Sequence, residues 1–289
     1  MNNKLNNMLK DFLENNNVKN IDEANEKLQD FIQKYNKNEI EYEATDLDNA
    51  YDILDEAQNS KSKKQAKKLA EEAYSVCSDC FDAISFKSSL EKNSIDRMNI
   101  LNEGLNFEED RLRKNKFFED DNMGSFYSIF ETRPYIRGLN QKAFYLAQDG
   151  KYKLAIELCK EILELNNSDN TGIRYLLMAL YACMEDEKAM LSLYEKYQEN
   201  HLEMLFPLMI LYYKFEDYDK AQYYLKQIKK SNSNFIKYYK GSLYVDELKT
   251  DGYFQIGSVS EIVMYNDNFE FLLNTVPNIS DFILSKMEK

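Results

Sequence analysis

The sequence predicts an all-α protein built from stacked helical hairpins, and three observations support this prediction. A short pattern recurs at a nearly constant interval, with alanines at Ala155, Ala189 and Ala221 in steps of 34 and 32 residues. The chain of 289 residues contains only 8 Gly and 3 Pro, the residues that disfavour a helix most strongly. Hydrophobic residues make up 44% of the chain, which is enough to bury a core along each hairpin.

A period near 34 residues is typical of tetratricopeptide-like repeats, which stack helical hairpins into a right-handed superhelical array. In such a hairpin the two helices cross closely where a small side chain lets their backbones approach. The three repeated alanines fit this position, and Ala66 fits it in an earlier helix. Met98 occupies the position in the hairpin between them and is the exception.

Residues 1–45 are expected to form an N-terminal helical cap. The spacing of Met8 and Phe12 predicts one short helix. Apolar residues between 21 and 35 recur every three or four positions, a pattern that predicts a second, amphipathic helix.

The repeat array is expected over residues 46–232. Its first hairpin has helices around 47–57 and 66–74, and its second runs from 79 to 105. An insertion at 106–130 separates these from the later hairpins. Asn and Asp residues between the later helices favour helix starts, because their side chains cap free backbone amides.

Residues 233–289 are expected to form a C-terminal helical cap that covers the last apolar face of the array. Helical segments are expected at 234–239, 259–265, 268–275 and 279–287, and Pro277 should interrupt the last two. Three of the eight glycines lie between 241 and 257, so regular structure should loosen there.

The formal net charge of −13 argues against a nucleic-acid partner, because nucleic-acid binders usually carry a basic surface. Basic clusters at 61–68 and 111–116 are interpreted as solvated helix faces or loops.

The two longest apolar runs, 175–184 and 204–213, have ten residues each, whereas a membrane span needs about 20. No apolar leader follows Met1, and the four cysteines come without an export signal, so we expect a cytoplasmic protein that contacts no membrane.

The segment Glu131-Thr132-Arg133-Pro134-Tyr135 resembles the signature of a bacterial family of tetratricopeptide-repeat proteins. That family is itself distantly similar to part of the eukaryotic suppression-of-tumorigenicity protein. The likeness extends through Asp169-Asn170-Thr171-Gly172-Ile173-Arg174-Tyr175-Leu176-Leu177 and covers roughly residues 45 to 285. Ser125 and Tyr127 stand where the family usually has His and Trp. The resemblance implies a cytoplasmic helical-repeat protein and carries no activity over to this chain.

Two groups of side chains are candidates for contact with a partner. Arg133, Arg137 and Arg174 are expected to form a fork for carboxylates, since a guanidinium binds a carboxylate through two hydrogen bonds. Alternatively, they pair with Glu131 and fix the structure after the insertion. The other group consists of tyrosines expected to be exposed on first helices of hairpins, namely Tyr145, Tyr175, Tyr181, Tyr212 and Tyr213. Their alternative role is packing between helices.

No catalytic residue, metal site or cofactor is expected. Cys77 and Cys80 have C-x-x-C spacing, but neither a βαβ context nor a matching set of zinc ligands accompanies them, so ordinary packing is favoured. His201 is expected at the surface, at a helix end beside Glu199 and Glu203, without a nucleophile motif. Acidic groups at 108–110 and 119–121 lack the glycine-centred loop of a calcium site.

The function that the sequence favours is a non-catalytic scaffold that binds a protein or a peptide on its concave face. One alternative is a peptide-responsive regulator whose curvature changes on binding. Another, from the enzyme class, is a thiol oxidoreductase that uses Cys77 and Cys80. The sequence does not specify the partner, the pathway or the oligomeric state.

Overall fold

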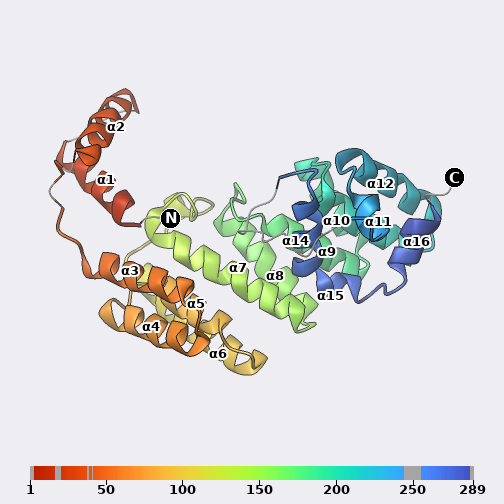
Figure 1. The fold of residues 1–289 in the computed structure, drawn as a ribbon, viewed down its shortest axis with the longest axis horizontal. Helices are drawn as coiled ribbons and strands as arrows, with labels where there is room; N and C mark the ends of the chain where they lie inside the picture. Colours follow the sequence, from red (N-terminus) through yellow and green to blue (C-terminus); the bar gives the residue numbers. More distant parts are fainter. Residues whose placement is uncertain (1–2, 17–20, 38, 41, 244–254, 287–289) are drawn as a thin grey trace. The chain divides into compact units, whose positions relative to one another are not determined.

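A computed structural model of the chain describes residues 3–16, 21–37, 39–40, 42–243 and 255–286 (Figure 1). Within these ranges the regular structure is helical, apart from one isolated β-bridge between Ser125 and Asn166. The all-α prediction is therefore confirmed. The chain forms two compact units, Met1–Arg111 and Leu112–Lys289. In the ranges that the structure describes, no helix is both long enough and apolar enough to cross a membrane.

The first unit begins with two helices, α1 (Asn3–Asn15) and α2 (Ile21–Asn36), as the sequence predicts. They pack against each other, and the rings of Phe12 and Phe31 meet edge to face with their centroids 5.5 Å apart. Such edge-to-face pairs add to the stability gained from burial alone.

The next hairpin consists of α3 (Asp46–Asn59) and α4 (Lys63–Val76), where the sequence places its first repeat. Thr45 and Asp48 form a capping box at the start of α3, in which each side chain accepts a hydrogen bond from the other residue's backbone amide. Ser62 caps α4 in the simpler way, through the amide of Gln65.

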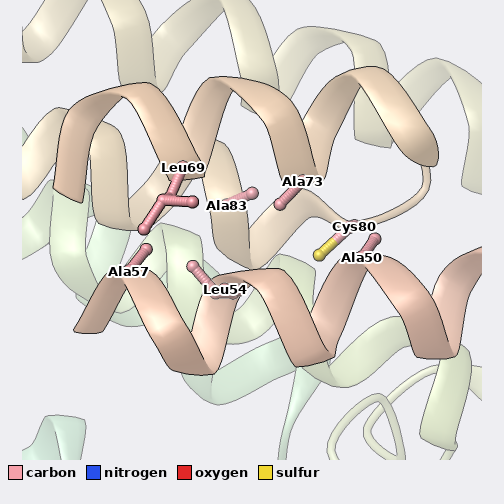
Figure 2. Packing of buried hydrophobic residues seen from close by; sticks show 7 residues of the cluster. All are labelled: Ala50, Leu54, Ala57, Leu69, Ala73, Cys80 and Ala83. Atoms are coloured by element: carbon pink, nitrogen blue, oxygen red, sulfur yellow. The ribbon is translucent and has the colours of Figure 1, made fainter. Parts of the chain in front are cut away.

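The core of this hairpin is made mostly of small side chains (Figure 2). Leu54 from α3 and Leu69 from α4 point toward each other, and alanines surround them. Cys80, at the start of α5 (Phe81–Ser89), is fully buried in the same cluster. Small side chains let three helices approach closely, so the packing that the sequence predicts around Ala66 extends along the whole hairpin.

The second hairpin, α5 with α6 (Ser94–Lys114), explains why Met98 breaks the repeat. The close approach occurs at Gly104, where a Cβ atom would lie 2.6 Å from Cγ2 of Ile84. Met98 is only half-buried. The small residue is therefore present in this hairpin, but it lies further along the helix. The helix also continues past Leu105 into the expected insertion.

The second unit contains three consecutive hairpins whose helices pack against one another. Their helices are α7 (Arg133–Gln148) with α8 (Tyr152–Leu165), α9 (Ile173–Met184) with α10 (Glu187–Tyr197), and α11 (Leu202–Lys214) with α12 (Tyr218–Ser231). Figure 1 shows these helices following one another in chain order. The last three sequence repeats thus correspond to three hairpins.

The register of the repeat differs from the prediction by one residue in α10. In the second helix of each hairpin, the fourth residue after the N-cap is fully buried. This residue is Ala155 after Lys151 in α8, Met190 after Asp186 in α10, and Ala221 after Asp217 in α12. Ala189 is only half-buried. Its amide instead donates to the Asp186 side chain, 3.0 Å away, as part of the helix cap.

Residues 115–130, the remainder of the expected insertion, are anchored in the second unit. They include two short 3₁₀ helices, η1 (Asp120–Asn122) and the start of η2 (Phe130–Thr132). Phe126 is fully buried, and its amide donates to the carbonyl of Leu165 at the end of α8. This loop therefore belongs to the core of the unit.

The C-terminal helices are α13 (Phe235–Tyr239), α14 (Val259–Asn268), α15 (Glu270–Leu273) and α16 (Ile279–Ser285). The four predicted segments are found, while Met287 and most of 241–257 lie outside the described residues. The segment α14–α15 also runs back along the unit, with α14 packed on α11 and α15 on α9 (Figure 1). Phe269, between them, meets Phe144 of α7 at 6.2 Å. First helices of all three hairpins are thus contacted by this segment.

Candidate functional site

Polar and charged side chains gather where α11 begins. We call this group the α11 polar cluster, and its members are Asp169, Arg174, Tyr175, Glu199, His201, Glu203, Asn232 and Glu261. They come from the loop before α9 with the first turn of α9, the loop before α11 with the first turn of α11, the residue after α12, and α14. Four separate stretches of chain therefore build one site.

Arg174 is the centre of the first half of the cluster. Its Nε and Nη2 atoms donate to the two carboxylate oxygens of Glu199, each at 3.0 Å. Its Nη1 donates to Oδ2 of Asp169 at 2.7 Å. The Asp169 carboxylate also accepts the backbone amides of Ile173 and Arg174, so it caps α9. Arg174 thus joins the start of α9 to the loop before α11.

His201 occupies the middle of the cluster. Its Nδ1 lies 2.8 Å from Oε2 of Glu203, and its Nε2 lies 3.2 Å from Oε2 of Glu199 and 3.3 Å from the Tyr175 hydroxyl. The side chain is only 12% exposed, so the expectation of a surface histidine is wrong. Burial alone would lower the pKa of His201, but the hydrogen bonds and charges of Glu203 and Glu199 outweigh it and raise the pKa.

Glu261 closes the cluster from α14. Its carboxylate accepts the amide of Leu202, the first residue of α11, at 3.2 Å, and the amide of Gly257 at 2.7 Å. Asn232 adds a third donor at 2.7 Å. Glu261 is fully buried, and burial is the main reason that its pKa is raised. This carboxylate therefore attaches the C-terminal segment to the start of α11.

The arrangement has the chemistry of cation or proton binding. Among the described residues, the partners of His201 are two carboxylates and a phenol, with no serine, threonine or cysteine nucleophile. His201, Glu203 and Glu261 each offer one ligand atom, and these atoms lie within 4.8 Å of one another. Sequence spacing did not reveal this group, because 59 positions separate Leu202 from Glu261.

No family model matches the chain, and no curated protein matches it.

The three predicted arginines have different environments. Arg174 lies in the α11 polar cluster, as described above. Arg133, at the start of α7, donates from Nε to the carbonyl of Tyr127 at 2.6 Å and lies over the rings of Tyr127 and Phe130. Arg137 is exposed on the same helix. Arg133 and Arg174 thus bind groups of their own chain.

The signature segment also starts α7. Pro134 lies in the first turn, where its missing amide is not needed. Thr132 is the N-cap residue, but its hydroxyl makes no capping bond. It donates instead to the carbonyl of Phe126 and lies 3.2 Å from that of Ile129. The hydroxyl therefore fixes the preceding loop.

The predicted tyrosines divide into two groups. Tyr145, Tyr181 and Tyr212 are buried, so the expectation that they are exposed is wrong. Tyr145 accepts a hydrogen bond from Gln141 at 2.7 Å, and Tyr212 donates to Glu187 at 2.8 Å. Their rings pack between helices while their hydroxyls find polar partners. Tyr175 and Tyr213 are half-buried.

The four cysteines are free thiols, and their environments predict unequal reactivity. Burial raises the pKa of Cys183 to about 12 and raises that of Cys159 further. Because the thiolate is the reactive form, these two should be alkylated slowly in the folded protein at mildly alkaline pH. Cys80 is fully buried, so Cys77 should react first.

Mass spectrometry of peptides after timed alkylation measures this order. In guanidinium all four cysteines should react at similar rates, which provides the control. Reaction of Cys183 as fast as Cys77 in the folded protein would contradict the burial of α9. Equal, rapid reaction of Cys77 and Cys80 would instead favour the thiol oxidoreductase.

Proposed function

We propose that the chain is a non-catalytic scaffold that binds a protein or a peptide. The supporting observation is an exposed aromatic surface on the last hairpin of the three-hairpin unit. We call it the α11–α12 patch, and it consists of Tyr213, Phe215 and Tyr218. Phe215 is 40% and Tyr218 45% exposed. Tyrosine and other aromatic residues are common anchors in protein interfaces.

The contacts within the patch hold it in place. The ring of Tyr213 lies 6.1 Å from that of Tyr218, and both lie within 6 Å of the ring of Phe282 on α16. Phe282 is buried, and its ring packs against the rings of both tyrosines. A preorganised aromatic surface loses little conformational entropy on binding.

This surface differs from the one that the sequence favours. The first helices of the hairpins are contacted by α14 and α15, and three of their candidate tyrosines are buried. Of the predicted contact residues, Arg137 is exposed, whereas Arg133, Arg174, Tyr175 and Tyr213 are half-buried. The proposal therefore places the partner on the α11–α12 patch.

The partner's chemistry follows from the patch and from the overall charge. Aromatic side chains bind apolar side chains of a partner, and a net charge of −13 favours partners with basic flanks. We therefore propose that the partner is a peptide segment in which apolar anchor residues lie between basic residues. Cytoplasmic location and membership of the family with the Glu-Thr-Arg-Pro-Tyr signature stay predictions that agree with this role.

Peptide display on the immobilised chain tests the proposal. Selected peptides should be apolar and basic, and isothermal calorimetry should show saturable binding. The Phe215→Ser, Tyr218→Ser double variant should bind them at least about tenfold more weakly, a loss of about 1.4 kcal/mol. Tyr35→Ser removes an exposed tyrosine from α2 and is the matched control. No selected binder, or equal weakening in the control, would refute the proposal.

A further inference from the structure

The α11 polar cluster contains more than the scaffold role requires. Two carboxylates and an imidazole, from Glu203, Glu261 and His201, meet in a nearly water-free place. Burying two carboxylates side by side is costly unless protons or a cation compensate their charge. A neutral imidazole and two carboxylates would be balanced by one divalent cation.

We infer that His201, Glu203 and Glu261 form a binding site for a first-row divalent cation of the Zn²⁺ type. Zn²⁺ takes nitrogen from histidine and oxygen from glutamate, usually in sets of three or four ligands. Imidazole favours this class of metal over Mg²⁺ and Ca²⁺, which prefer all-oxygen sites.

The histidine is oriented as in a metal site. Its Nδ1 faces Glu203, whereas its Nε2 faces the carboxylate of Glu199 at 3.2 Å. Metal-binding histidines commonly donate their other ring N–H to a carboxylate, which fixes the ring and makes the ligand more basic. Glu199 is in turn held by two hydrogen bonds from Arg174. The outer partners of a metal ligand are therefore already present.

A second, independent observation comes from Tyr265. It follows Glu261 by one helical turn on α14, is fully buried, and its hydroxyl has no hydrogen-bond partner among the described residues. The Tyr265 ring lies 5.1 Å from that of Phe206, which follows Glu203 by one helical turn on α11, so the ring lies one turn from the cluster. Buried polar groups without a partner are rare and commonly indicate an ion or a water molecule. A water molecule bound to the cation would supply a partner for this phenol.

The required rearrangement is small. Ligand atoms within 4.8 Å of one another must approach by roughly 1 Å to lie about 2.1 Å from one ion. The proton between His201 and Glu203 leaves to solvent as the cation enters, since metal binding displaces protons from its ligands. Glu261 keeps the Leu202 and Gly257 amides as additional partners.

The test uses the full chain without an affinity tag, after treatment with a chelator. Calorimetry should show one Zn²⁺ bound per chain, and thermal unfolding should shift to higher temperature with Zn²⁺ but not with Mg²⁺ or Ca²⁺. The chain has a single histidine, so the NMR signals of its two ring nitrogens identify the ligand directly. Zn²⁺ should change the Nδ1 signal most.

Variants separate this site from adventitious binding. Glu203→Gln should weaken Zn²⁺ binding at least about tenfold, the range found for changes around metal ligands. Glu195→Gln, at an exposed carboxylate on α10, should leave it unchanged. With Co²⁺, visible absorption should show nitrogen and oxygen ligands and no thiolate charge-transfer band. An unchanged His201 NMR signal at saturating Zn²⁺, or a thiolate band, would overturn the inference without any variant.

Discussion

Replacing Arg174 with methionine should lower the unfolding free energy of the second unit by about 3 kcal/mol. The substitution keeps an unbranched apolar stem but removes the charge that neutralises Asp169 and Glu199. The Asp169 side chain is fully buried, so its carboxylate would lose its charged partner without gaining water. It keeps two backbone donors, and Glu199 is 30% exposed, so the loss lies at the lower end for a broken buried pair.

Hydrogen exchange of α9 and α11 amides provides the measurement, because it reports the second unit separately from the first. Arg137→Met, at an exposed position of α7, is the matched control and should change stability by less than about 1 kcal/mol. Combining Arg174→Met with Glu199→Gln should cost less than the sum of the two, since the residues share one interaction. Additive effects would show that the Arg174–Glu199 pair is not formed in solution.

The helices could be predicted because their burial pattern is local. Apolar residues that recur every three or four positions lie on one face of a helix. That face of α3 or α12 is therefore expected in the core, whichever element covers it. The predicted register of α10 is wrong by one residue, because the prediction takes Ala189 as the repeated buried position. The cap residues Asp186 and Asp217 carry the better signal, since each precedes the fully buried position by four residues.

The candidate site could be predicted only in part. Glu199 and Glu203 are sequence neighbours of His201, and both contact it. Arg174 and Glu261 come from 25 and 59 positions away from their partners Glu199 and Leu202. No local spacing encodes such contacts. The Arg174 contact arises because α9 packs on α11, and the Glu261 contact because α14 returns to α11, a path that the sequence does not define.

The sequence does carry a signal for the burial of some of these tyrosines. A helix that is apolar on all sides is usually covered on all sides. Every residue of α11 from Leu202 to Tyr212 is buried, because α9, α12 and α14 all pack on it. The second apolar run of the sequence therefore indicated a covered helix, and with it the burial of Tyr212.

The second large effect is expected for Phe206→Ala, at about 4 kcal/mol of unfolding free energy. The Phe206 side chain is fully buried in α11. Its ring lies 5.3 Å from Phe235 of α13 and 5.1 Å from Tyr265 of α14. Alanine would leave a cavity between three helices and remove these aromatic contacts. Denaturant unfolding with hydrogen exchange as readout measures the loss.

The position of the loss identifies what Phe206 holds together. Amides of α13 and α14 should lose protection more than those of α7 and α8, because the cavity lies between α11 and the C-terminal helices. Phe215→Ala, at an exposed position just after α11, should cost less than about 0.5 kcal/mol. Equal effects of the two variants would mean that α14 does not pack on α11 in solution. Since Glu261 also belongs to α14, Phe206→Ala should weaken the cation site as well, although it removes none of the ligands.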